Sequence, residues 1–276
     1  MSGPPIDPKA FRDFERAVHN SNANSYHDLF RAVTDRAIAP LLDAAGVGPG
    51  MRFLDVAAGP GGVAGEAARR GARATGVDLA PAMVALASRL YPGIEFREGS
   101  ADQLPFQDAS FDAVACAFGL GHFPEPERAV AEFARVLAPG RKVALAWWDD
   151  FSRSRINGIF FDALARHAEQ TPNAPPAGPP MDRYSDRDRF AELLRSAGLD
   201  AVGVAGVSGT YRLRDADALW QLGMGSFARA SSMIRAQTEA VQRQIRLAVT
   251  DIARAHASDG GLEVPVAFLV ASGTRR

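Results

Sequence analysis

The chain has 276 residues, a formal net charge of −1 and one cysteine. Its length allows one large α/β domain with additional cap segments. The near-zero charge argues against a nucleic-acid partner, because a protein that neutralises phosphates normally carries a basic surface. With one cysteine, the chain has no internal disulfide and no cysteine-based zinc site.

The amino-terminal segment lacks the basic start and apolar core of a signal peptide, and no apolar run reaches the length of a membrane-spanning helix. We therefore expect a cytoplasmic protein with no membrane partner. Helical periodicity begins at Ala10, with Phe11, Phe14 and Val18 on one face. A second helical stretch is predicted from Tyr26 to Ala45 and ends at a Gly-Pro-Gly breaker. Together they predict an amino-terminal helical cap over residues 10–46.

Strands and helices then alternate over residues 47–150, which we expect to form the cofactor-binding core. The predicted strands cover residues 51–57, 72–78, 94–98, 111–117 and 142–148, and the helices between them end at Arg70, Leu90 and Leu137. This order indicates βαβ units, a mostly parallel sheet and helices on both faces.

The rhythm changes after Trp148. Residues 156–169 and 187–197 read as helices, and the proline-rich segment 171–180 reads as neither helix nor central strand. Strands are predicted at 202–213 and 264–272, flanking a helical region over 215–256. We expect one domain over residues 1–276, with cap insertions at 151–185 and 215–257 that enclose a substrate pocket.

A glycine loop follows the first predicted strand. Gly59-Pro60-Gly61-Gly62 opens the next helix, where free N–H groups and backbone without side chains suit a closely bound ligand. Asp78 ends the second strand, 19 residues after Gly59, where its carboxylate can accept ribose hydroxyls. Gly59, Gly61 and Ala64 also fit a dinucleotide fingerprint. Asp55, inside the first strand, disfavours that alternative, because such folds usually have an apolar residue there.

Several motifs in order resemble the Methyltransf_11 or UbiE-like group of class I S-adenosylmethionine-dependent methyltransferases. The resemblance covers residues 51–148. It is carried by Asp55–Gly61, Asp78-Leu79, Glu98–Phe106, Phe111–Val114 with Leu120–Pro124, and Ala134–Gly140. It implies a Rossmann-like methyltransferase fold with a seven-stranded, mostly parallel sheet. Two positions depart from the group: Ala57 replaces a glycine, and Ser100 replaces an acid.

The resemblance also implies the cofactor and its contacts. Residues 57–61 are expected near the methionine portion of S-adenosylmethionine, with Asp55 ordering their loop. Around the adenosine we expect Asp78, Leu79, Met83, Ser100, Ala101 and Asp102. Ala117 is expected to face the methionine amino group through its carbonyl.

Methyl transfer by in-line displacement needs alignment more than it needs a metal, and we predict no metal ion. His122, after the fourth strand, is the candidate general base, with packing beneath the next helix as the alternative. Tyr26, His27 and Trp148 are candidates for the substrate pocket. Cys116, in an apolar run, is expected to be a buried small hydrophobe.

We therefore predict methyl transfer to an O, N or C atom of a small, apolar or polycyclic acceptor. The lysine-poor composition, with Lys9 and Lys142 alone, suggests a bacterial source and specialised metabolism, and quinone methylation competes with that choice. Three alternatives stay open: a non-methylating cyclase or pericyclase that retains the cofactor, an NAD(P)-dependent oxidoreductase, and a binding protein with a vestigial pocket. The oligomeric state is not set by the sequence, and a homodimer is one option.

Overall fold

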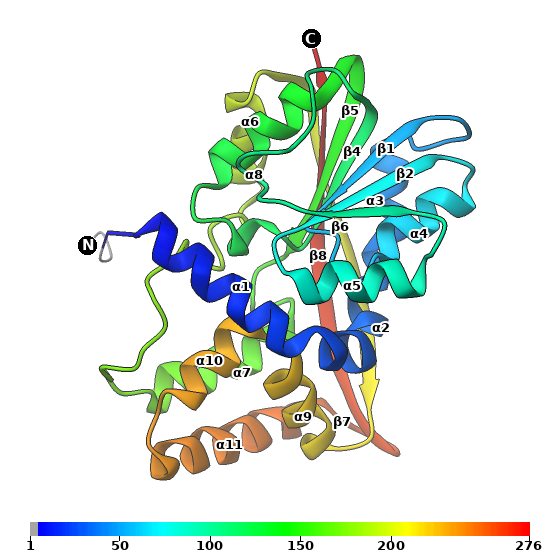
Figure 1. The fold of residues 1–276 in the computed structure, drawn as a ribbon. Helices are drawn as coiled ribbons and strands as arrows, with labels where there is room; N and C mark the ends of the chain where they lie inside the picture. The colour runs from blue at the N-terminus through cyan, green and yellow to red at the C-terminus, as the bar shows by residue number, and fades with distance from the viewer. Residues whose placement is uncertain (1–4) are drawn as a thin grey trace.

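A computed structural model describes residues 5–276, so residues 1–4 of the expected domain lie outside the described part (Figure 1). One sheet runs through the molecule in the strand order β3-β2-β1-β4-β5-β8-β6, and the short β7 pairs with β8. Strands β1 to β5 are parallel to one another, whereas β8 is antiparallel to both β5 and β6. The bounds are β1 Arg52–Val56, β2 Arg73–Asp78, β3 Glu95–Glu98, β4 Phe111–Ala117, β5 Leu137–Trp148, β6 Leu199–Leu213, β7 Ala257–Ser258 and β8 Gly261–Arg275.

The expected fold is confirmed: a mostly parallel sheet of seven main strands with helices on both faces. One face carries α3 (Ile38–Ala44), α4 (Gly62–Arg69) and α5 (Pro81–Leu90), and the other carries α6 (Pro126–Val136) and α8 (Arg187–Ser196). Strand β4 is buried over most of its length because both of its faces are covered, which explains its continuous apolar sequence. Cys116 within it is fully buried and free, as expected.

Helices from three parts of the chain gather at the carboxyl ends of the parallel strands (Figure 1). They are α1 (Pro8–Ser25), α7 (Arg155–His167), α9 (Ala216–Ser226), α10 (Ala228–Arg235) and α11 (Glu239–Ala253). Contacts of α1 with α9 and α10, and of α7 with α10 and α11, join them into one cap. No helix within residues 5–276 is both long and apolar enough to cross a bilayer.

The stretch from Tyr26 to Ala45 is helical as predicted, but it is not one regular α-helix. The chain forms a π-helical turn at Tyr26–Phe30, the short helix α2 (Arg31–Thr34), a 3-10 turn at Asp35–Ala37 and then α3. This break turns the chain from the cap toward the sheet, and a π-helical turn is common beside a functional site. Strand β5 starts at Leu137, earlier than predicted. Residues 137–141, which include the Pro-Gly pair, already belong to the strand.

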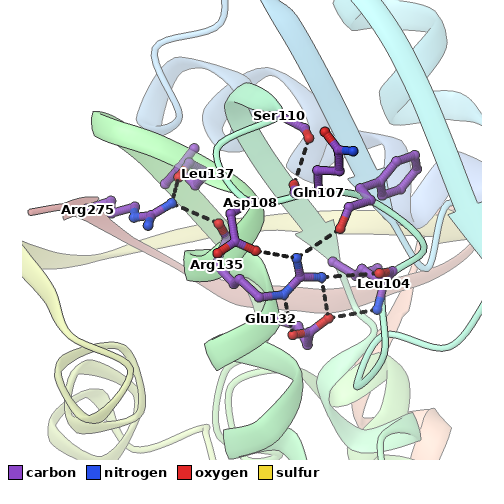
Figure 2. Close-up of polar contacts among 9 residues, drawn as sticks. Leu104, Gln107, Asp108, Ser110, Glu132, Arg135, Leu137 and Arg275 are labelled. Atoms are coloured by element: carbon purple, nitrogen blue, oxygen red, sulfur yellow. Dashed lines mark hydrogen bonds and ion pairs between the residues drawn. The ribbon is translucent and has the colours of Figure 1, made fainter.

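A partly buried arginine fixes the loop that follows β3. Arg135, in α6, donates to the carbonyls of Leu104 and Phe106 at 3.1 and 2.8 Å and pairs with Asp108 and Glu132 (Figure 2). Glu132 in turn accepts the backbone N–H of Leu104 at 2.8 Å. The loop over residues 99–108 is therefore held in one conformation by α6, which matters because its start reaches the site described next.

Candidate active site

One large cavity lies between the carboxyl ends of β1, β2 and β4 and the helical cap. Its volume is about 1190 Å³ and it opens to solvent. Most of the residues predicted for the cofactor border it, although they come from four separate segments. These are Ala57, Gly59, Asp78, Leu79, Met83, Ser100, Ala101, Asp102 and Ala117. Gly61 does not border it, because the space next to its Cα is filled by Phe96 and Tyr91.

Asp55 is an uncompensated acid at the end of β1. It is 1% exposed, and its Oδ2 accepts the backbone N–H of Ala64 at 3.0 Å. Its Oδ1 is buried and has no hydrogen-bond partner within residues 5–276. Burial raises the pKa of Asp55 to about 8. A second hollow of about 430 Å³ next to the main cavity is bordered by Asp55, Ala57 and Gly59, so a ligand in the loop comes close to this acid.

Asp78 holds the glycine loop in place. Its Oδ2 accepts the N–H of Gly59 at 2.8 Å, and its Oδ1 accepts the N–H of Ala80 at 2.9 Å. Burial raises the pKa of Asp78 above its ordinary value. Gly59 has a positive φ of 51°, and within residues 5–276 no atom beyond its own chain neighbours lies within 4 Å of the position a Cβ would take. The backbone at Gly59 is thus open to close approach by a ligand.

These features fit S-adenosylmethionine. The cofactor carries a cationic ammonium group, a sulfonium, ribose hydroxyls and an apolar adenine ring. The site offers an orphaned carboxylate oxygen on Asp55, a second carboxylate on Asp78, an open glycine backbone and the buried apolar side chain of Met83. Acceptor oxygens near cationic groups and hydroxyls, with an apolar surface for the ring, are the donor set that this ligand requires.

Asp102, considered from sequence as an adenine contact, already has protein partners. Its carboxylate accepts from Arg12 Nη2 at 2.6 Å and from the Ser100 hydroxyl. Arg12 lies in α1, so this part-buried pair fastens the cap helix to the loop over residues 99–108. Sequence analysis missed Arg12, because one arginine in an amphipathic helix carries no local signal.

Two residues with side chains adopt left-handed backbone at the site. Ala57 has φ 56° and Phe118 has φ 58°, and both border the cavity directly after β1 and β4. A non-glycine residue in this region costs on the order of 1 kcal/mol, and such strain gathers at functional sites. Ala57 therefore holds a backbone conformation that glycine adopts without this cost.

The part of the cavity under the cap is aromatic. Phe118 stacks on Trp148 with ring centroids 4.2 Å apart, and Phe30 lies 5.7 Å from Trp148. Tyr26 borders the cavity as expected, whereas His27 does not. Trp147, the neighbour of Trp148, points the other way into the core and donates to the carbonyl of Met181 at 2.9 Å. The arrangement suits a flat apolar ligand.

A polar cluster borders the same cavity. His122 Nδ1 lies 2.9 Å from Glu15 Oε2, and His19 Nε2 lies 3.3 Å from the same oxygen. Burial opposes ionisation of Glu15, but the two imidazoles outweigh it and lower the pKa of Glu15 to about 2. His19 has a raised pKa: burial disfavours its charged form, and Glu15 more than compensates.

Sequence analysis singled out His122 and missed both Glu15 and His19. One signal was present: Glu15 follows Phe11 by four residues, which places a charged side chain on the apolar face of the predicted helix. The three side chains also form a grouping with the spacing of metal ligands, with ligand atoms all within 4.8 Å of one another. The spacing of the histidines along the sequence could not predict this grouping of three side chains.

The chain is similar to known methyltransferases. Residues 54–145 match the family model described as a methyltransferase domain. A demethylmenaquinone methyltransferase from Renibacterium salmoninarum is 32% identical over 177 residues, covering 61% of this chain and 75% of that protein. One from Chlorobaculum parvum is 47% identical over 164 residues, covering 53% of this chain and 65% of that protein.

Solved structures agree on the fold. A putative methyltransferase from an antibiotic biosynthesis pathway of Anabaena variabilis has a TM-score of 0.59 at 18% identity, covering 87% of this chain and 96% of that one. The [4+2]-cyclase SpnF has a TM-score of 0.57 at 20% identity, covering 100% and 99%. Fold and site thus define an S-adenosylmethionine-dependent methyltransferase. The chain belongs to the class I methyltransferases, in the family that includes these demethylmenaquinone methyltransferases.

Proposed function

We propose that the protein binds S-adenosylmethionine through the glycine loop, Asp55 and Asp78, and methylates a small apolar or polycyclic acceptor that lies against Phe118 and Trp148. The observation that carries the proposal is one shared cavity, bordered by the loop and Asp78, by the aromatic side chains and by His122. Binding both molecules in one cavity aligns nucleophile, methyl and sulfur, which can contribute about 7–11 kcal/mol to catalysis.

The bound cofactor supplies an activated methyl group and leaves as a neutral thioether. The residues of the chain hold the loop, exclude water and accept a proton. Asp78 holds the loop, the cap helices and the aromatic side chains exclude water, and His122 accepts the proton that an O–H or N–H acceptor releases. A positioned base typically contributes about 10²–10⁴-fold. If a carbon atom is methylated, the same base can remove a proton from a neighbouring hydroxyl.

The relatives suggest one acceptor, since their name specifies demethylmenaquinone. A naphthoquinol suits the stacked aromatic side chains as well as a specialised metabolite does. A panel of naphthoquinols and hydroxylated polycycles, analysed by mass, separates these acceptors. Product mass also separates methyl transfer, which adds one CH2, from a cyclisation that leaves the mass of the substrate unchanged.

Calorimetric titration with S-adenosylhomocysteine tests the cofactor site. Asp78→Ala and Gly59→Val are expected to abolish binding, because one removes the loop anchor and the other covers the open backbone. Gly46→Val is the matched glycine control, since Gly46 also has a positive φ and open space around it. Asp251→Ala is the matched acid control, because the side chain of Asp251 is exposed on α11. Binding of NAD(P) in place of S-adenosylhomocysteine would contradict the proposal.

A further inference from the structure

The hydrogen bond between Glu15 and His122 sets the tautomer of the imidazole. The Glu15 side chain is 1% exposed, and its lowered pKa keeps it ionised. An ionised carboxylate only accepts hydrogen bonds, so Nδ1 of His122 carries a proton, and in the neutral imidazole the lone pair lies on Nε2. The His122 ring is 23% exposed and borders the cavity. The free nitrogen is therefore the one that an acceptor can reach.

Charged and titratable groups from three elements surround this pair. Besides Glu15, the charged or titratable groups that face the cluster are His19 from α1, Arg229 from α10 and Asp78 from the end of β2. Burial disfavours the charged form of His19, but Glu15 outweighs it and raises the pKa of His19, so the carboxylate favours the charged form of this neighbouring imidazole.

We propose that Glu15 positions His122 as the base, and that the pair takes the proton of an aromatic hydroxyl group on the acceptor. This rests on the proposed function and names its acceptor class. A neutral imidazole can remove a proton from a phenol, whose acidity resembles that of tyrosine at about 10, far more readily than from an aliphatic alcohol. The rings of Phe118 and Trp148 favour an aromatic body for the same molecule.

The step balances without any further reactant. The hydroxyl proton moves to Nε2 of His122, and the electron pair left on oxygen is shared with the adjacent ring carbon. A bond then forms from the methyl group to that oxygen or carbon as the methyl–sulfur bond breaks. When carbon is methylated, the ring carbon afterwards releases its hydrogen as a proton to solvent, and the ring becomes aromatic again. The same base thus serves O-methylation and ring C-methylation of a phenolic acceptor.

The first test observes the tautomer without any cofactor. In the full chain with ¹⁵N-labelled histidine, the ring-nitrogen shifts of His122, assigned by their loss in His122→Asn, should report a proton on Nδ1. E15Q should populate the other tautomer, because an amide can also donate. Glu239→Gln, on exposed α11, is the matched control and should leave the spectrum unchanged. An unchanged spectrum in E15Q would overturn the proposal. If E15Q does not fold, Glu15→Asp gives the same test with the charge retained and the distance lengthened.

The second test uses 2-naphthol and its saturated analogue decahydro-2-naphthol as acceptors. We expect methylation of the naphthol alone, a fall in kcat of about 10²-fold or more in E15Q with little change in KM for S-adenosylmethionine, and an altered pH profile. An E15Q enzyme with the wild-type kcat and pH profile would reduce Glu15 to a structural residue. Methylation of the aliphatic alcohol, or of neither compound, would overturn the acceptor class.

The cluster offers one competing occupant, a divalent metal ion. Elemental analysis of the purified protein distinguishes the two. If the protein contains one equivalent of metal that is lost in E15Q, and a chelator removes its activity, then the cluster is a metal centre and Glu15 does not position His122 as a base. These outcomes leave S-adenosylhomocysteine binding untouched, so the failure of this inference and the failure of the proposed function are distinguishable.

Discussion

Replacing Asp55 by asparagine should stabilise the ligand-free protein at neutral and alkaline pH. Asparagine keeps the shape of the side chain and can still accept the hydrogen bond from the Ala64 N–H through its carbonyl oxygen. It removes the ionisation that burial opposes. Asp55 should therefore be a residue that costs stability in the free enzyme and is kept for ligand binding.

The magnitude follows from the pKa. The folded value of about 8 lies above the unfolded value of 3.8, so the folded state binds a proton that the unfolded state has released. Stability from this group is complete below the unfolded pKa and is lost as pH rises toward the folded pKa. At pH 7 the loss spans about three pH units, or on the order of 4 kcal/mol at 1.36 kcal/mol per unit.

Urea unfolding of the wild type and D55N between pH 4 and 8 measures this loss. The two proteins should be similar in stability near pH 4, and D55N should lead by a few kcal/mol at pH 8, which is on the order of 10 °C in Tm. Taking the difference between them cancels the contributions of Asp78 and His19, which have the same sign. A difference that stays constant with pH, or a less stable D55N at pH 8, would refute the reasoning.

Three further substitutions test the supports of the site, each by urea unfolding. Arg135→Lys should cost about 2–4 kcal/mol and weaken S-adenosylhomocysteine binding, because one ammonium cannot replace the guanidinium contacts to the loop over residues 99–108. Ala57→Gly should gain up to about 1 kcal/mol by relieving the left-handed backbone. Gly223→Ala should cost about 1–3 kcal/mol, because the added methyl would lie 2.0 Å from the buried ring of Phe160. Wild-type stability in any of the three would contradict the corresponding contact.

The parts of the fold that the sequence predicts well are those governed by local pattern. The helix Pro81–Leu90 and the strand Phe111–Ala117 have the expected bounds, since proline, periodicity and a continuous apolar run act over a few residues. The break at Tyr26–Phe30 has no such signal. The two-residue strand β7 also has no local signal in the sequence, because it forms only through its pairing with β8.

The candidate site divides in the same way. The glycine loop and Asp78 follow a recurring motif, so their positions are readable from sequence. The contact between Glu15 and His122 joins residues 107 positions apart, and only the packing of α1 over the sheet brings them together. Arg12 and Asp102 are likewise paired across 90 positions. A single sequence carries no information on such pairs beyond one acid on an apolar helix face.

The orphaned oxygen of Asp55 also predicts how ligand binding should depend on pH. If the ammonium group of the ligand is bound by ionised Asp55, affinity for S-adenosylhomocysteine follows the ionised fraction of that acid. It should then rise about tenfold per pH unit below the pKa of about 8 and level off above it. In D55N the affinity should be lower and should lose this slope. Calorimetric titration at pH 6, 7 and 8 measures both proteins. A wild-type affinity that does not change with pH would mean that Asp55 orders the loop without pairing with the ligand, because a carboxylate that gains a cationic partner must lose its proton on binding.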